Sequence, residues 1–213
     1  MGADCPKQYL PLAGKPLIAH TLERLAAHPR IAGLMVVLGA QDEYWPRIGL
    51  PQGKPVRTTV GGAERSDSVL AGLEALPSEV GADDFVLVHD AARPCVRAAD
   101  IARLIECASR GDGGLLGAPL RDTLKRAGED SFSLATEPRE QRWRAFTPQM
   151  FRRGELVAAL RNVSRDGRAV SDEAMAMELA GFRPLLVEGA EDNIKITTAA
   201  DLALAEFLLT RTA

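Results

Sequence analysis

The chain has 213 residues, a length that fits one domain of ordinary size. Hydrophobic residues make up 46% and charged residues 26%, so the chain can bury a full core without disulfides. With 26 Lys and Arg against 29 Asp and Glu, the formal net charge is −3, which argues against a protein built mainly to hold duplex nucleic acid. Small anionic ligands are not excluded, because a chain with a net charge near zero can still carry local clusters of Arg and Lys.

Cysteine use and apolar runs indicate where the protein resides. Cys5, Cys95 and Cys107 form no CxxC pair and no disulfide framework, so a reducing compartment is expected. The longest apolar runs, such as Gly33–Gly39 and Phe85–Val88, are far shorter than the roughly 20 residues that span a bilayer. No basic segment followed by an apolar segment opens the chain. We expect a soluble, cytoplasmic protein, with residues 1–213 forming a single domain and with neither a membrane nor a nucleic acid as partner.

The first half of the chain alternates short β-rich runs with helical patterns, which is typical of a parallel sheet with crossover helices. Strands are predicted at Leu34–Leu38, Val56–Val60, Phe85–His89 and Gly113–Ala118. Helices are predicted where apolar residues recur at three- and four-residue spacing, at Lys15–His28, Glu64–Leu76 and Ala98–Ser109.

The alternation of strands and helices stops between Arg121 and Phe146, where the chain is polar, has an alternating residue pattern and shows little helical periodicity. The stretch predicts a β-excursion that leaves the main body as an arm. Beyond it the pattern predicts helices at Phe151–Leu160, Asp172–Ala180 and Asp201–Thr210, and strands at Pro184–Val187 and Asn193–Thr197. The expected fold is a three-layer α/β domain with helices on both faces of the sheet and one projecting arm.

Ligands of open α/β sheets bind beyond the carboxyl ends of the strands. The strand at Phe85–His89 is followed by Asp90 and Arg93, which could hold a divalent metal and a phosphate. A helix cap or a surface ion pair is the more common explanation of a lone Asp–Arg pair. The strand at Val56–Val60 is followed by Gly61 and Gly62, whose backbone a ligand can approach closely. The helix that begins after them offers free N–H groups to an anion, but a capped turn explains these residues equally well.

Two lysines are further candidates. Lys195 alternates with Ile194 and Ile196, which places it on the opposite face of its predicted strand, in an anion pocket or at a solvated edge. Lys7 lies in a predicted loop and alone indicates almost nothing. The motifs GxSxG, HExxH, GxxxxGK[ST] and GxGxxG are absent from the sequence, and its histidines are too scattered for a metal triad.

Seven motifs in fixed order are more specific together than singly. They are PKQYL (Pro6–Leu10), GGxxRxxSVLxGL (Gly61–Leu73), VLVHDAARP (Val86–Pro94), RDTLKR (Arg121–Arg126), FTPQMF (Phe146–Phe151), SDEAxAxE (Ser171–Glu178) and DNIKIT (Asp192–Thr197). In this order, from about Pro6 to Thr210, the chain closely resembles the 2-C-methyl-D-erythritol 4-phosphate cytidylyltransferases of the non-mevalonate isoprenoid pathway.

The resemblance implies a Rossmann-like nucleotidyltransferase sheet and transfer of a cytidylyl group from CTP to methylerythritol phosphate, with release of pyrophosphate. It also implies a divalent metal, most often Mg²⁺. The substrate phosphate attacks the α-phosphorus of CTP in line, so the protein supplies positioning and charge neutralisation rather than a nucleophile. The segment 121–146 is then a dimerisation arm, exchanged between the two subunits of a homodimer.

The same resemblance assigns roles on the nucleotide side. Lys7 would neutralise the α-phosphate in the transition state, while Gly61, Gly62 and Ser68 would read the cytosine. Asp90 would assist the metal and the substrate hydroxyls, and Asp192 is a weaker metal candidate.

On the methylerythritol phosphate side, Lys195 would hold the phosphate together with Thr123, Arg139 and Thr147. Lys7, Arg139 and Lys195 are therefore the expected catalytic residues, and Arg93 is expected among the residues that bind substrate.

Two features depart from the family pattern. Its members begin with a strand and a glycine-rich loop that ends in an essential Arg, directly before the segment that corresponds to Met1–Tyr9. We expect these elements to lie upstream of Met1 in the complete protein. Ala63 stands where relatives often carry a polar residue, which changes the interpretation little.

Two other functions remain open at this point. One is a ribitol 5-phosphate cytidylyltransferase, which shares the fold and much of the CTP site, although DTLKR and TPQ favour methylerythritol phosphate. The other is a non-catalytic paralogue that binds nucleotide, against which the joint presence of Lys7, Asp90, Arg139 and Lys195 speaks.

Overall fold

The computed structural model describes residues 5–211. Its helices are α1 (Leu17–Ala27), α2 (Arg65–Glu74), α3 (Ala98–Ala108), α4 (Arg153–Arg165), α5 (Glu173–Leu179) and α6 (Ala199–Arg211), with 3₁₀ turns η1 (Lys7–Tyr9) and η2 (Trp45–Arg47). Its strands are β1 (Pro11–Leu12), β2 (Lys15–Pro16), β3 (Leu34–Leu38), β4 (Val56–Val60), β5 (Phe85–Val88), β6 (Gly114–Pro119), β7 (Leu124–Ala127), β8 (Ser133–Glu137), β9 (Trp143–Arg152) and β10 (Leu185–Glu188).

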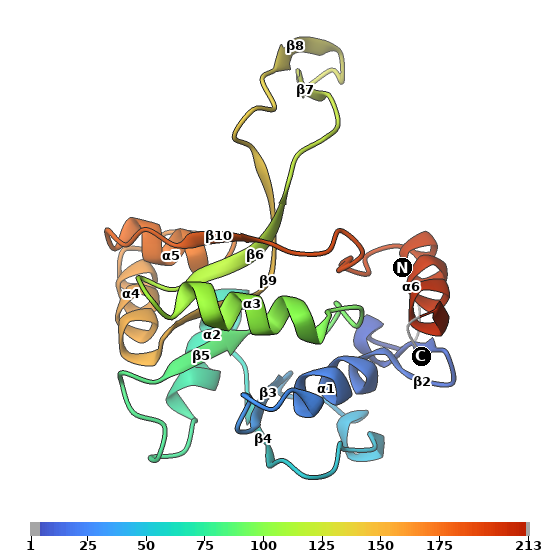
Figure 1. The fold of residues 1–213 in the computed structure, drawn as a ribbon, viewed down its shortest axis with the longest axis vertical. Coiled ribbons are helices and arrows are strands. Elements are labelled where there is room, and N and C mark those ends of the chain that lie inside the picture. Colours follow the sequence, from blue (N-terminus) through green and yellow to red (C-terminus); the bar gives the residue numbers. More distant parts are fainter. Residues whose placement is uncertain (1–4, 212–213) are drawn as a thin grey trace.

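The central sheet has the strand order β10-β6-β9-β5, and the parallel pair β3-β4 forms a separate sheet. Helices α2, α4 and α5 pack on one face of the central sheet, and α3 packs on the other (Figure 1). Because successive side chains of a strand point to opposite faces, Leu115 of β6 joins the first helix layer and Leu116 the second. The predicted three-layer α/β architecture is confirmed.

The prediction of a parallel sheet was wrong at β9. Phe151 was expected to begin a helix, but Trp143–Arg152 form one strand that runs antiparallel to both β5 and β6, and α4 begins at Arg153. Residues 146–151 are all buried. A short apolar run that is buried on both faces has no period of its own, so the sequence does not distinguish a strand from a helix there.

The predicted strand at Asn193–Thr197 is also absent, because this segment is an irregular stretch of chain. It is fixed instead by single bonds, among them the one that the Ile196 N–H donates to the Ala92 carbonyl at 2.9 Å. Ile196 is fully buried against Leu12 of β1 and Ala205 of α6. The alternation of Ile194 and Ile196 thus reflects packing of a loop against the core and not strand pairing in a sheet.

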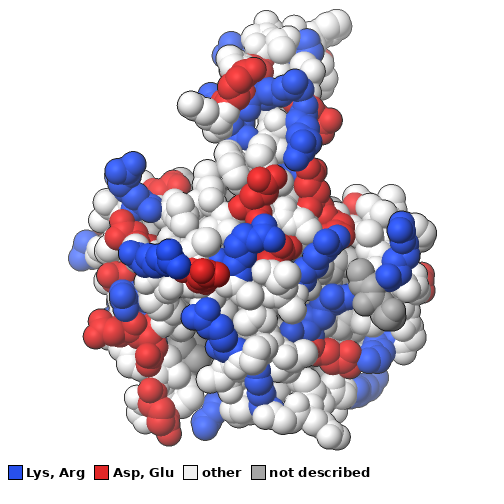
Figure 2. Space-filling view, in the orientation of Figure 1, with Lys and Arg blue, Asp and Glu red and all other residues white. Residues whose placement is uncertain are grey.

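The hairpin of β7 and β8 stands away from the body, connected by β6 and β9 (Figure 1). Its base starts after β6 as predicted, but the last residues of the predicted arm, Trp143–Phe146, belong to β9 of the central sheet. Phe132 and Leu134 near its tip are 73% and 63% exposed. Figure 2 shows side chains of both charges where the arm leaves the body, and there Arg121 and Arg144 both pair with Glu191. No helix within residues 5–211 is long and apolar enough to cross a membrane.

Candidate active site

The Asp90 carboxylate, just beyond the end of β5, is contacted by three cations. Its oxygens lie 3.3 Å from Arg65 Nη2, 3.4 Å from Arg93 Nε and 3.1 Å from Lys195 Nζ. Burial acts to raise the pKa of Asp90, but Lys195, Arg65 and Arg93 outweigh it and hold the pKa below its usual value. The structure therefore brings Lys195 to Asp90 and Arg93, which follow β5, and adds Arg65 of α2 to them. We call these four residues the Asp90 cluster.

Arg93 points inward and fixes the loop that carries Lys195. Its side chain is 10% exposed, and its Nη1 donates to the Asn193 carbonyl at 2.7 Å. Its guanidinium also lies 5.3 Å from the centre of the Phe146 ring, within the range of a cation–π contact. Asn193 is fully buried and donates from Nδ2 to the Thr147 carbonyl at 2.8 Å. The buried residue Asn193 thus anchors the loop two residues before Lys195.

Thr147 joins the cluster from β9 through its hydroxyl. Its Oγ1 accepts a bond from the Asp90 N–H at 3.0 Å and lies 2.9 Å from His89 Nδ1. His89 Nε2 lies 3.1 Å from the Arg93 carbonyl, which can only accept, so Nε2 carries the proton and Nδ1 accepts from Thr147. Burial lowers the pKa of His89 to about 4, which keeps the ring neutral near pH 7. His89 therefore fixes the orientation of the Thr147 hydroxyl.

The glycine pair after β4 is required by close packing against α2. A Cβ on Gly61 would lie 2.6 Å from Ser68 Oγ, and one on Gly62 would lie 2.4 Å from Asp67 Cβ. The helix begins with a capping box in which Glu64 and Asp67 satisfy each other's backbone N–H. Ser68 Oγ lies 3.5 Å from the Gly62 carbonyl, a long contact that leaves the hydroxyl free to reorient. Gly61, Gly62 and Ser68 thus form one tight turn.

Lys7 is exposed on η1, the 3₁₀ turn that Tyr9 anchors. Tyr9 is buried, stacks on Tyr44 at 5.2 Å between ring centres and donates from its hydroxyl to Asp42 Oδ2 at 2.6 Å. The same apolar cluster includes Ala91, the residue after Asp90. This packing places η1 beside the loop of the Asp90 cluster.

Thr123 and Arg139 lie at the base of the arm, and both are exposed. The Arg139 guanidinium donates to the Arg121 carbonyl across the base. Within the chain from residue 5 to residue 211, neither side chain contacts the Asp90 cluster. The structure of the chain does not bring these two predicted residues to the others.

Asp192 belongs to a different charge pair from Asp90. Its Oδ2 binds Arg97, and its buried Oδ1 has no hydrogen-bond partner among the described residues. No group of three His, Cys, Asp or Glu suited to a metal occurs in residues 5–211. A dication at Asp90 would also face the three cations already there. The two predicted ligands therefore do not fit a metal that Asp90 and Asp192 would hold jointly.

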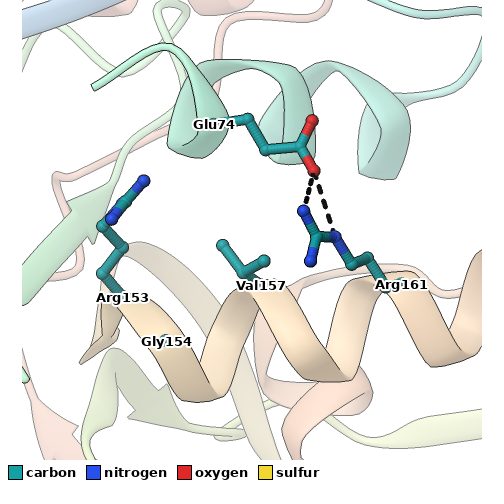
Figure 3. Close-up of a pocket in the computed structure, with 5 residues that line it drawn as sticks. All are labelled: Glu74, Arg153, Gly154, Val157 and Arg161. Carbon is teal, nitrogen blue, oxygen red and sulfur yellow. Dashed lines mark hydrogen bonds and ion pairs between the residues drawn. The ribbon is translucent and has the colours of Figure 1, made fainter. Parts of the chain in front are cut away.

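A cavity of about 410 Å³ lies elsewhere, between α2 and α4. Glu74, Arg153, Gly154, Val157 and Arg161 line it, and the Glu74–Arg161 ion pair spans it (Figure 3). None of the predicted site residues takes part in it. We therefore take the Asp90 cluster, where the polar contacts converge, as the site.

Sequence reasoning assigned no role to Arg65, Glu173, His89 or Asn193. Arg65 forms two bonds with the buried carboxylate of Glu173 and one with Asp90. All four residues lie inside the motifs GGxxR, SDE, VLVHD and DNIKIT. One signal could have found them. Each is a polar residue close to a strand or helix end, in a motif whose neighbouring residues were assigned a role.

Comparison with known proteins identifies the family of the chain. The family model described as 2-C-methyl-D-erythritol 4-phosphate cytidylyltransferase matches residues 1–211. A protein of that description from Stenotrophomonas maltophilia (strain R551-3) is 58% identical over 214 residues, which cover 100% of this chain and 92% of the relative. One from Xanthomonas euvesicatoria pv. vesicatoria (strain 85-10) is 59% identical over 210 residues, which cover 98% of this chain and 79% of the relative.

Solved structures of similar fold carry the same description or a related one. A crystal structure of 4-diphosphocytidyl-2C-methyl-D-erythritol synthase has a TM-score of 0.86 at 37% identity and covers 96% of this chain and 95% of its own. The Francisella tularensis 2-C-methyl-D-erythritol 4-phosphate cytidylyltransferase also has a TM-score of 0.86, at 33% identity, and covers 96% of this chain and 94% of its own.

Proposed function

The chain belongs to the 2-C-methyl-D-erythritol 4-phosphate cytidylyltransferase family, and from this premise we propose how its residues carry out the transfer. It is a cytidylyltransferase of the non-mevalonate isoprenoid pathway, as the sequence motifs indicated. The family match sets aside the ribitol 5-phosphate enzyme and the non-catalytic paralogue. The substrates implied by the family name are CTP and methylerythritol phosphate.

In the proposed reaction, an oxygen of the methylerythritol phosphate attacks the α-phosphorus of CTP in line. A new P–O bond forms, the bond between the α-phosphorus and the bridging oxygen breaks, and pyrophosphate leaves with that electron pair. The attacking phosphate is already anionic at neutral pH, so no general base is required. Catalysis then consists of positioning the two substrates and neutralising charge, which cationic side chains can supply.

The Asp90 cluster is the observation that carries the proposal for the methylerythritol phosphate site. Arg65, Arg93 and Lys195 bring three positive charges, against the negative charges of Asp90 and Glu173, so the cluster keeps an excess of positive charge. Arg93 is 10% exposed and Arg65 is bound by Glu173, so Lys195, which is 40% exposed, is the cation most available to a ligand. We assign Lys195 to the substrate phosphate, and Asp90 to orienting Lys195 and the substrate hydroxyls. The Thr147 hydroxyl supports Asp90 by accepting a hydrogen bond from the Asp90 backbone N–H.

We assign the nucleotide to the turn after β4 and to η1. The tight turn of Gly61 and Gly62 exposes backbone groups that a small pyrimidine edge can reach, and the long contact of Ser68 leaves its hydroxyl free to bond the base. Lys7, exposed beside the Ala91 loop, is assigned to the negative charge that develops at the α-phosphate. A cation placed at developing charge lowers the barrier more than it strengthens ground-state binding.

We propose that the protein is a homodimer in which Thr123 and Arg139 serve the partner's site. Neither residue contacts the Asp90 cluster of its own chain, and the arm that carries them projects from the body (Figure 1). Phe132 and Leu134 on the arm are large apolar residues that are mostly exposed, as expected of a surface that a second copy covers. Two-fold symmetry then makes the exchange reciprocal.

We keep Mg²⁺ as the proposed cofactor, bound chiefly by the triphosphate, because Mg²⁺ commonly uses substrate phosphates together with few protein ligands. Neither Asp192 nor Asp90 is a strong protein ligand in this proposal, since Asp192 Oδ2 is paired with Arg97 and the Asp90 oxygens face three cations. The cytoplasm is the proposed location, which the free thiols of Cys5, Cys95 and Cys107 support.

Pyrophosphate release measured with CTP and Mg²⁺ tests the assignment of the acceptor. The protein expressed from its complete gene should release pyrophosphate with methylerythritol phosphate and far more slowly with ribitol 5-phosphate. Preference for ribitol 5-phosphate would contradict the proposal. Omission of Mg²⁺, with EDTA present, should abolish release with either acceptor.

A further inference from the structure

We propose that Glu173 is a positioning residue that acts through Arg65 to keep the Asp90–Lys195 pair in place. The inference deepens the function proposed above, because it rests on Lys195 holding the methylerythritol phosphate. Neither Glu173 nor Arg65 was assigned a role from the sequence.

One guanidinium bridges two carboxylates. Arg65 donates from Nη1 and Nη2 to the two oxygens of Glu173, at 2.5 and 3.1 Å, and from Nη2 to Asp90 Oδ1 at 3.3 Å. The Glu173 side chain is 1% exposed, whereas Asp90 faces the site. The planar fork of Arg suits this double contact, and a Lys has no equivalent geometry.

Glu173 is itself fixed by the strand that carries Thr147. It is the first residue of α5, whose N-cap Asp172 accepts a bond from the Met175 N–H at 2.9 Å. Gln149 of β9, which is 1% exposed, donates to Asp172 Oδ2 at 3.0 Å and accepts from the Ala174 N–H at 2.8 Å. Gln149 and Thr147 are both carried by β9, two residues apart in the chain. The same strand thus positions both Asp90 and the buried anchor of Arg65.

The charge balance explains what Glu173 does for the site. A buried carboxylate that loses its partner is strongly destabilised, so Arg65 stays with Glu173 and makes only one contact with Asp90. Asp90 Oδ2 then remains available to Lys195, at 3.1 Å. Without the charge of Glu173, both Arg65 Nη groups would be free to pair with Asp90. Arg65 would compete with Lys195 for the same carboxylate, and Lys195 would lose its fixed position.

Steady-state kinetics of the Glu173→Gln variant test the proposal. The KM for methylerythritol phosphate should rise about tenfold, the scale of one weakened hydrogen bond to a charged group, while the KM for CTP stays within about twofold. The second substitution Arg65→Gln in the Glu173→Gln background removes the competitor and should bring the KM for methylerythritol phosphate back toward that of the wild type. If Glu173→Gln raised the KM only by damaging the fold, the further loss of the Arg65 side chain would not restore the KM. No rise in the single variant, or no recovery in the double variant, overturns the proposal.

Glu74→Gln is the matched control, because it removes the ion pair that Glu74, at the opposite end of α2 from Arg65, forms with Arg161 (Figure 3). It should leave both KM values unchanged. If Glu173→Gln does not give a cooperative thermal unfolding transition, Glu173→Asp is the second variant, because it weakens the Glu173–Arg65 pair more mildly. It should raise the KM for methylerythritol phosphate by a smaller factor, and an unchanged KM in this variant also overturns the proposal.

Lys195→Ala separates the role of Lys195 in phosphate binding from the positioning role of Glu173. If it leaves the KM for methylerythritol phosphate unchanged, the proposed role of Lys195 fails; if it raises that KM and Glu173→Gln does not, only the role of Glu173 fails.

Discussion

Lys195 Nζ lies 3.1 Å from Asp90 Oδ2, although the two residues are far apart in the sequence. The contact depends on two anchors between their loops, the Arg93 bond to the Asn193 carbonyl and the Ile196 bond to the Ala92 carbonyl. The loop after β5 and the segment before α6 are therefore one structural unit. Changes in either loop are expected to alter the phosphate site.

Lys7→Ala should lower kcat by on the order of 10²–10³, as the loss of a group that stabilises developing charge does. Because Lys7 is exposed on η1 and Tyr9 supplies the anchor, the free energy of unfolding should change little. Steady-state kinetics with both substrates provide the measurement. A change confined to the KM for methylerythritol phosphate would show that the role of Lys7 is ground-state binding of that substrate.

Mixing of Arg139→Ala and Lys195→Ala subunits tests whether the arm acts across the dimer. Each variant alone should be nearly inactive. In a random mixture half the dimers are mixed, and one of their two sites holds both wild-type residues, so activity should recover to about a quarter of that of the wild type. Mass spectrometry of the intact dimers confirms the exchange. If exchange is complete and no activity returns, Arg139 acts within its own subunit.

Gly62→Ala should destabilise the protein by about 1–3 kcal/mol and raise the KM for CTP, because its Cβ would lie 2.4 Å from Asp67 Cβ at the start of α2. Gly49→Ala is the matched control, since a Cβ at Gly49 meets no atom within 4 Å. Chemical denaturation gives the stability, and initial rates give the KM. Equal behaviour of the two variants would show that the turn tolerates a side chain and is not shaped by the close approach.

The stability of the fold should depend on His89 between about pH 6.5 and pH 4. Burial lowers the pKa of His89 to about 4 in the folded chain, against an ordinary value of 6.5. The unfolded chain therefore binds more protons in this window, so the free energy of unfolding falls as the pH drops, by up to about 3 kcal/mol.

His28, whose pKa burial also lowers, titrates in the same direction. The comparison of the wild type with His89→Gln at pH 7 and pH 5 isolates His89, and the variant should lose less stability on acidification. A variant as sensitive to pH as the wild type would show that His89 is not held neutral.

The α/β pattern, most helices and the arm could be predicted because periodicity reports which face of an element is buried. The strand β9 could not, because Phe146 to Phe151 are buried on both sides and carry no period. Within the site, Asp90 was identified because it follows an expected strand, and Lys195 because it alternates with two isoleucines in an expected strand, even though that segment is a loop. Glu173 was missed because its importance depends on Arg65, a contact between two helices that no local pattern reports.

The central claim is that the Asp90–Lys195 pair binds the methylerythritol phosphate rather than CTP. Calorimetric titration of each ligand into the wild type and into Lys195→Ala tests it most directly, with Lys15→Ala, which removes an exposed ion pair to Glu23, as the control. Lys195→Ala should weaken binding of methylerythritol phosphate at least about tenfold and leave the Kd for CTP unchanged. Lys15→Ala should leave the Kd of both ligands unchanged. Weakened binding of CTP together with unchanged binding of methylerythritol phosphate would contradict the claim.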